Sequence, residues 1–139
     1  MNIDRRKFLK SSFSLCGATI IGSSIFLESC QKSAVNPAGN INFTLDLSQP
    51  AKAALNTPGG SIVSKGVIVV NSAGTFVALS DICTHQGCLV YYNKSGNDFL
   101  CPCHAGAYNI SGAVIAGPPP AALTKYNVSQ SGNILTITG

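Results

Sequence analysis

Apolar and polar residues alternate strictly over residues 41–47, INFTLDL, with every odd-numbered position apolar. This alternation is typical of a β-strand with one buried and one exposed face. Further along, a β-branched run at 67–70 and an apolar segment at 75–79 flank the turn-forming residues 71–74, Asn-Ser-Ala-Gly. These two segments therefore predict a hairpin.

The remaining apolar segments of the body are short and separated by polar or glycine-containing turns. They predict strands at 88–92, 98–100, 107–110, 113–115, 126–128 and 134–138. No helical stripe of useful length stands out in the sequence after the N-terminal leader. The fold class expected is all-β, a small domain of about nine or ten strands.

The length of 139 residues suits a single domain, and 14 glycines and 7 prolines suit many short strands joined by turns. The net charge of +4 is divided evenly between the leader and the body. Residues 30–139 contain five lysines, three aspartates and no arginine. Nucleic-acid binding is not expected, because it needs a patch of cations that neutralises phosphates.

The N-terminal leader contains an export pattern. Residues 4–10 read DRRKFLK, which resembles the twin-arginine export signal, with Asp4 where Ser or Thr is usual. The alternative is the basic segment of an ordinary secretory signal. The twin-arginine route carries proteins across the membrane after they have folded.

An uncharged segment follows at residues 11–27. As a helix it would extend about 26 Å, shorter than the roughly 30 Å hydrocarbon core of a membrane, so it is better interpreted as a signal segment. Leu27-Glu28-Ser29-Cys30 resembles a lipobox, which would place a lipid on Cys30; the alternative is an uncleaved anchor helix. The expected organisation is a signal or membrane anchor at 1–29, a polar linker at 30–40 and one domain at 41–139.

Two short boxes carry the chemistry-bearing residues, and they contain the only two histidines of the chain. The first box is Cys83-Thr84-His85-Gln86-Gly87-Cys88 and the second is Cys101-Pro102-Cys103-His104-Ala105-Gly106. Each box offers a thiolate and an imidazole two or three residues apart, and the intervening residues are enough for a hairpin that brings the boxes together. Two sulfur and two nitrogen ligands suit an iron–sulfur cluster and also tetrahedral zinc.

The pattern C-T-H-x-G-C followed by C-P-C-H resembles the Rieske iron–sulfur proteins, in particular the disulfide-bearing branch found in cytochrome bc complexes and arsenite oxidase. Residues 117–120, Gly-Pro-Pro-Pro, are similar to the Gly-Pro-x-Pro loop of that family. The resemblance covers most of residues 60–139. It implies stacked antiparallel sheets with a two-loop cluster-binding subdomain.

The resemblance also assigns roles to residues. It implies one [2Fe–2S] cluster with Cys83 and Cys101 on one iron and His85 and His104 on the other. It implies a disulfide between Cys88 and Cys103, a hydrogen bond from the Tyr108 hydroxyl to a ligand sulfur, and the proline loop as a cover. Imidazole ligands in place of thiolates remove negative charge and so raise the reduction potential, to about −150 to +300 mV in Rieske centres.

This chain departs from the quinol-oxidising relatives at two places. Ala105 and Gly106 stand where that branch has Gly-Ser, so a hydroxyl that donates to a bridging sulfide is missing, and Gln86 stands where Leu is common. The function expected is one-electron transfer by a membrane-tethered carrier or small electron-transfer subunit on the periplasmic side, with a redox protein or membrane oxidoreductase as partner. The alternatives are a subunit of a quinol-oxidising bc-type complex and a non-redox zinc or disulfide-stapled lipoprotein.

Overall fold

A computed structural model describes residues 40–139 of the chain. The predicted signal or anchor segment, Cys30 and most of the linker lie outside the described residues. Within residues 40–139, no helix combines the length and the apolar character that a membrane crossing would need.

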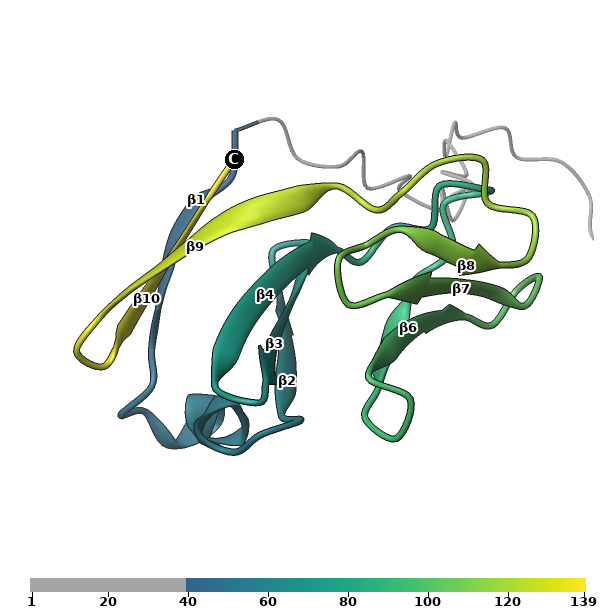
Figure 1. The fold of residues 1–139 in the computed structure, drawn as a ribbon. Coiled ribbons are helices and arrows are strands. Elements are labelled where there is room, and N and C mark those ends of the chain that lie inside the picture. Colours follow the sequence, from purple (N-terminus) through teal and green to yellow (C-terminus); the bar gives the residue numbers. More distant parts are fainter. Residues whose placement is uncertain (1–39) are drawn as a thin grey trace, which may run out of the picture. The chain divides into compact units, whose positions relative to one another are not determined.

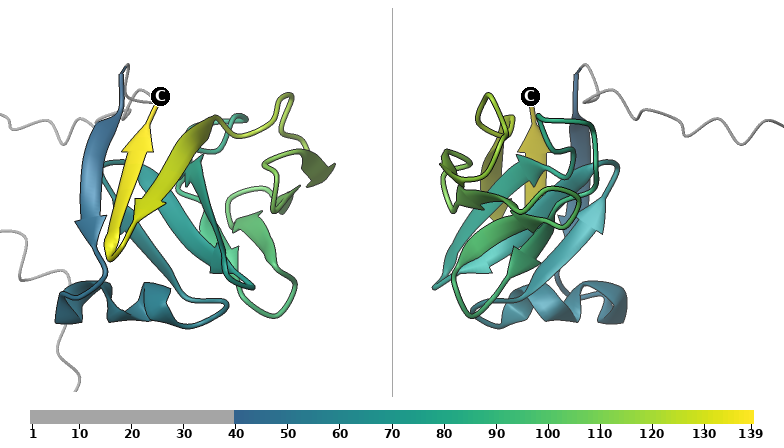
Figure 2. Two further views of the ribbon diagram at one scale, coloured as in Figure 1. Left: turned by 60° about the vertical axis from the view of Figure 1, so that its left-hand side comes forward. Right: turned by 90° about the vertical axis from the view of Figure 1, so that its right-hand side faces the viewer.

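The described residues form two antiparallel sheets, shown in Figure 1 and from two further sides in Figure 2. The larger sheet has six strands in the order β1-β10-β9-β4-β3-β2. Its strands are β1 (Asn42–Asp46), β2 (Ser61–Ser64), β3 (Val67–Ser72), β4 (Thr75–Ser80), β9 (Lys125–Ser131) and β10 (Ile134–Thr138). The smaller sheet has the order β5-β6-β7-β8. Its strands are β5 (Tyr91–Asn93), β6 (Asp98–Cys101), β7 (Gly106–Asn109) and β8 (Val114–Ala116).

The alternating pattern of apolar and polar residues at 41–47 correctly predicted which side chains of this segment are buried. Ile41, Phe43, Leu45 and Leu47 are all buried, and they belong to the core of the larger sheet. The β-branched run in β3 has no polar alternation because both faces of β3 are covered. Val67 and Val69 face the core of the larger sheet, whereas Ile68 and Val70 belong to a second core with Phe99 and Tyr108 of the smaller sheet. Strand β3 therefore joins the two halves of the domain.

Three features differ from the sequence prediction. Strand β2 was not predicted, because its two apolar residues do not share a buried face and Val63 is 60% exposed. A 3-10 helix, η2 (Pro50–Asn56), also escaped prediction, since it is short and buries only Leu55. The strand predicted at 88–92 begins at Tyr91, because Leu89 forms an isolated bridge with Ile82 instead of pairing with β6.

Candidate metal centre

The first box is a loop closed by its own backbone. The N–H of Cys83 donates to the carbonyl of Cys88 (2.8 Å), and the N–H of Gly87 donates back to the carbonyl of Cys83 (2.9 Å). Gly87 has a φ of 70°, a left-handed conformation that glycine adopts without steric cost. The base of the loop is fixed by the hydrogen bond from Val90 N–H to Asp81 carbonyl (2.8 Å). This geometry holds Cys83 inward, with 3% of its surface exposed.

The second box is the tip of the β6–β7 hairpin. Cys101 ends β6 and pairs with Gly106, the first residue of β7, so the four residues between them form a tight turn. Ala105 in this turn has a φ of 53°, which is unusual for a residue with a side chain. Cys101 is buried, whereas His104 is exposed.

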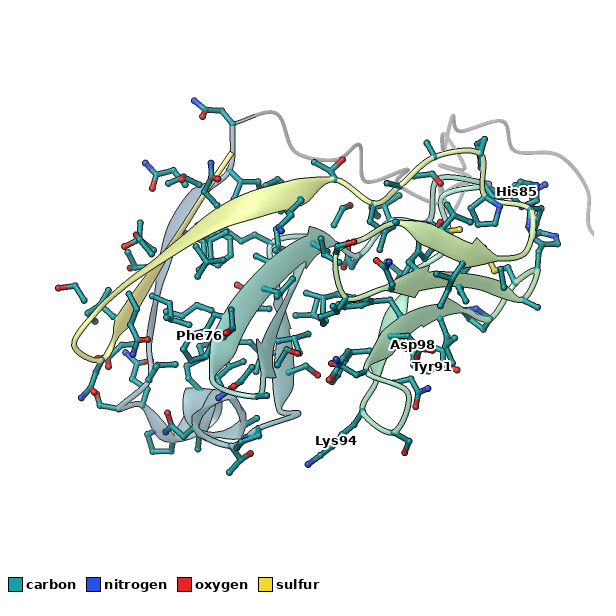
Figure 3. All side chains as sticks on the ribbon, in the orientation of Figure 1. Phe76, His85, Tyr91, Lys94 and Asp98 are labelled. Carbon is teal, nitrogen blue, oxygen red and sulfur yellow. A yellow bond between two sulfur atoms is a disulfide. The ribbon has the colours of Figure 1, made fainter. Side chains whose placement is uncertain are left out.

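The two boxes lie against each other. A disulfide joins Cys88 to Cys103, which confirms the predicted pairing. The rings of His85 and His104 have centroids 4.8 Å apart and are nearly perpendicular. Figure 3 shows His85 beside the sulfur atoms at one end of the smaller sheet, with Lys94 on the hairpin at the other end.

The two free thiols within residues 40–139, Cys83 and Cys101, lie in different surroundings. Burial by itself raises the pKa of Cys83, but hydrogen bonds from the Tyr108 hydroxyl and from backbone N–H groups of the box outweigh it, and the pKa of Cys83 is lowered. Burial and the neighbouring Cys83 raise the pKa of Cys101. One thiolate is thus stabilised before a metal contributes its own charge, which suits a sulfur that ligates iron.

The Tyr108 hydroxyl is the predicted partner of a ligand sulfur, and the structure places it 3.2 Å from Sγ of Cys83. Tyr108 is fully buried, opposite Phe99 across the β6–β7 ladder. A thiolate ligand can only accept hydrogen bonds, so Tyr108 is the donor once Cys83 is ionised.

The donor set fits an iron–sulfur cluster. Nδ1 of His85 is buried and has no hydrogen-bond partner within residues 40–139, although a buried ring nitrogen normally has one. A metal ion would satisfy this lone pair. The sulfurs of Cys88, Cys101 and Cys103 lie within 4.8 Å of one another, but the disulfide occupies two of them, so only Cys101 offers a thiolate from this group.

The proline segment, residues 117–121, touches both boxes. A Cβ placed on Gly117 would lie 2.7 Å from the carbonyl oxygen of Ala105, and one placed on Gly106 would lie 2.8 Å from Cγ of Pro119. These two glycines allow the segment to approach the second box closely. At its other end the Thr84 hydroxyl of the first box donates to the carbonyl of Ala121 (2.6 Å).

Comparison with known proteins decides which cofactor this arrangement serves. The family of the Rieske [2Fe–2S] domain matches residues 48–127. The chain belongs to the Rieske family. The cofactor is therefore a Rieske-type [2Fe–2S] cluster and not the zinc ion that the ligand types alone would also allow.

Several relatives of this Rieske protein are iron–sulfur subunits of the cytochrome b6-f complex. It is 32% identical over 142 residues to the cytochrome b6-f complex iron–sulfur subunit of Chlorobaculum thiosulfatiphilum. The alignment covers 99% of this chain and 77% of the relative. Among solved structures, it is similar to the plasma membrane Rieske protein PetC3 from Synechocystis PCC 6803, with 35% identity and a TM-score of 0.50, covering 55% of this chain and 81% of that one.

The ferredoxin of carbazole 1,9a-dioxygenase from Nocardioides aromaticivorans IC177 shares the fold. Its TM-score is 0.51 at 23% identity, and the match covers 60% of this chain and 90% of the ferredoxin. Together with the family match, these similarities confirm the predicted fold of stacked antiparallel sheets with a two-loop cluster-binding part.

The Rieske protein transfers electrons one at a time, and the cluster supplies that redox chemistry when bound. The residues of the chain hold and tune it. The disulfide and the proline segment tie the two boxes together, Tyr108 donates to the sulfur of Cys83, and burial of both free cysteines keeps water away from the sulfurs. Hydrogen bonds to ligand sulfur and exclusion of water are two of the means by which proteins set the potential of such clusters.

Sequence reasoning gave no role to Thr84, although it noted this residue within the first box. In the structure its hydroxyl lies between Tyr108 and Ala121, and its backbone N–H donates to the Tyr108 oxygen (3.2 Å). Ala121 is 37 residues away along the chain, so no local pattern could have revealed the contact.

Proposed function

We propose that this chain is a membrane-tethered periplasmic electron carrier or small electron-transfer subunit. In this proposal Cys83, His85, Cys101 and His104 ligate the cluster, and Cys30 carries a lipid anchor. Export by the twin-arginine route would deliver the folded, loaded protein to the outer side of the membrane.

The ligand assignment is supported by the contrast among the cysteines. Cys83 and Cys101 are the two free, buried thiols within residues 40–139, because Cys88 and Cys103 are bonded to each other. The adjacent rings of His85 and His104 are the matching nitrogen donors. Nδ1 of His85 is buried without a partner, which supports its use as a ligand atom.

The presence of glycine at position 106 is the observation that favours an electron carrier over a quinol-oxidising subunit. Gly106 occupies the position from which a serine hydroxyl would reach a bridging sulfide in the quinol-oxidising branch, and Pro119 fills the space that such a side chain would need. Fewer hydrogen bonds to the cluster sulfurs favour a lower potential. Quinol oxidation needs an acceptor of high potential, so this feature argues for a different electron donor.

A second candidate function is the iron–sulfur subunit of a quinol-oxidising cytochrome bc-type complex. It is favoured by the relative from Chlorobaculum thiosulfatiphilum, a cytochrome b6-f subunit whose similarity covers 99% of this chain. Exposed Gln86, at the tip of the first box where Leu is common in that branch, argues against an apolar contact with a quinol site.

Two measurements on the full-length loaded protein separate these candidates. The carrier proposal predicts a reduction potential below that of quinol-oxidising Rieske subunits and no quinol-dependent reduction in isolated membranes. A high potential together with reduction by quinol that is sensitive to quinol-site inhibitors would establish the second candidate. An absorption spectrum that does not bleach on reduction would contradict both.

A further inference from the structure

The hydroxyl of Tyr108 has more partners than protons. It lies 3.2 Å from Sγ of Cys83 and also 3.2 Å from Oγ1 of Thr84. Its oxygen already accepts the backbone N–H of Thr84 (3.2 Å). Tyr108 is fully buried, so its single proton has two possible acceptors, the sulfur at a short hydrogen-bond distance and the hydroxyl oxygen at a long one.

The direction of the Thr84 hydroxyl is fixed by the proline segment. Its oxygen lies 2.6 Å from the carbonyl of Ala121, and a carbonyl can only accept. The one proton of Thr84 is thereby committed to Ala121. Toward Tyr108, the Thr84 hydroxyl therefore presents only lone pairs, and it attracts the same proton that the Cys83 sulfur requires.

We propose that Thr84 is a positioning residue that competes with Cys83 for the hydroxyl proton of Tyr108 and thereby holds the reduction potential below the value that undivided donation would give. The inference rests on the proposed role of Cys83 as a ligand. The proline segment takes part, because Thr84 is a pure acceptor only while its own proton is bound to Ala121. The seating of residues 117–121 on the first box thus affects the electronics of the cluster as well as its exposure to water.

The deciding experiment compares reduction potentials by protein-film voltammetry. Thr84→Val removes the hydroxyl but keeps the backbone N–H that holds Tyr108 in place, and solvent can satisfy the exposed Ala121 carbonyl. We expect Thr84→Val to shift the potential upward, Tyr108→Phe to shift it downward by a larger amount, and Thr84→Ser to leave it unchanged. In the Tyr108→Phe background, Thr84→Val should have no further effect, because no proton remains to be shared.

A matched control is available at Thr57, whose hydroxyl also donates to a backbone carbonyl, that of Ala54 (3.1 Å). Thr57→Val should leave the potential unchanged. Resonance Raman spectra provide a second readout, since the Fe–S stretching bands should move in opposite directions in Thr84→Val and Tyr108→Phe.

The outcomes distinguish this inference from the proposed function. A fall in potential in Thr84→Val, or an equal effect of Thr84→Val with and without the Tyr108 hydroxyl, would assign Thr84 a purely structural role and overturn the inference alone. An unchanged potential in Tyr108→Phe would show that this hydroxyl proton does not stabilise the cluster, and it would overturn the inference while leaving the proposed function intact. A Cys83→Ser variant that keeps its colour and potential would instead contradict the assignment of Cys83 as a ligand.

Discussion

Pro119 lies directly on the backbone of Gly106, so that a Cβ at position 106 would lie 2.8 Å from its Cγ and 3.2 Å from its Cδ. The absence of a side chain at 106 has two effects at once. It removes a hydroxyl that could donate to the cluster, and it allows the proline segment to close onto the second box.

Gly106→Ser and Gly106→Ala test the two effects separately. Both variants must displace Pro119, and we expect each to lower the free energy of unfolding by about 1–3 kcal/mol, as overpacking does. Only serine supplies a hydroxyl, so Gly106→Ser should have a higher reduction potential than Gly106→Ala. Thermal unfolding and voltammetry on the pair provide the measurements. Equal potentials in the two variants would show that the hydroxyl does not reach the cluster.

The proposed ligands should be individually indispensable. Replacing Cys83 or Cys101 by Ser, or His85 or His104 by Ala, should yield colourless protein with little bound iron. Cys30→Ser, outside both boxes, is the control and should keep the visible spectrum. A coloured, reducible Cys83→Ser variant would show that the ligand assignment is wrong.

Replacing both Cys88 and Cys103 by Ser should leave a protein that assembles some cluster but loses it faster. The bonded cysteines are separated by 15 residues, and closing a loop of that length stabilises a fold by about 3 kcal/mol in the chain-entropy estimate. Iron release to a chelator, followed over time, measures the effect. Alkylation of both thiols in the unreduced native protein, detected by mass spectrometry, would contradict the disulfide.

Ala105→Gly should stabilise the protein by roughly 1 kcal/mol, because Ala105 has a φ of 53° and a left-handed conformation is unfavourable for a residue with a Cβ. Ala113→Gly is the matched control, since Ala113 is exposed and is not among the residues with positive φ. The control should lose about 0.5–1 kcal/mol through backbone entropy. Denaturant unfolding of both variants gives the comparison, and a loss of stability in Ala105→Gly would refute the strain.

Cys30→Ala tests the proposed anchor. If residues 27–30 are processed as a lipobox, the variant should accumulate as unprocessed precursor and take up no palmitate label. More than one acyl chain is needed for stable anchoring, at about 0.8 kcal/mol per buried methylene. Membrane-bound protein of unchanged mass in both the wild type and the variant would favour an uncleaved helix instead. Lys32→Ala, in the predicted linker, is a suitable control for processing.

Features of the fold and of the site that depend on a local pattern of residues could be predicted from the sequence. The alternation at residues 41–47 predicted which side chains are buried, and the family resemblance of the two boxes predicted the cofactor that the family match confirms. Strand β2 could not be predicted in this way, because its pairing with β3 supplies the order that its own residues do not encode.

Contacts between distant residues were equally beyond local patterns. The contact of Thr84 with Ala121 and that of Gly106 with Pro119 both join the proline segment to boxes that are distant from it in the sequence. The family resemblance supplied the disulfide and the Tyr108 hydrogen bond, and the structure contains both.

Strand β3 sets a limit on how this protein can be divided. Ile68 and Val70 pack in the same buried cluster as Phe99. An excised fragment containing only the cluster-binding sheet would lack them and would expose its own half of that cluster to water. A miniature redox module cut from residues 81–124 would need substitutes for two strands of the other sheet, because Leu79 of β4 belongs to the same core. The cluster-binding half is thus not an independent folding unit, because part of its hydrophobic core belongs to the larger sheet.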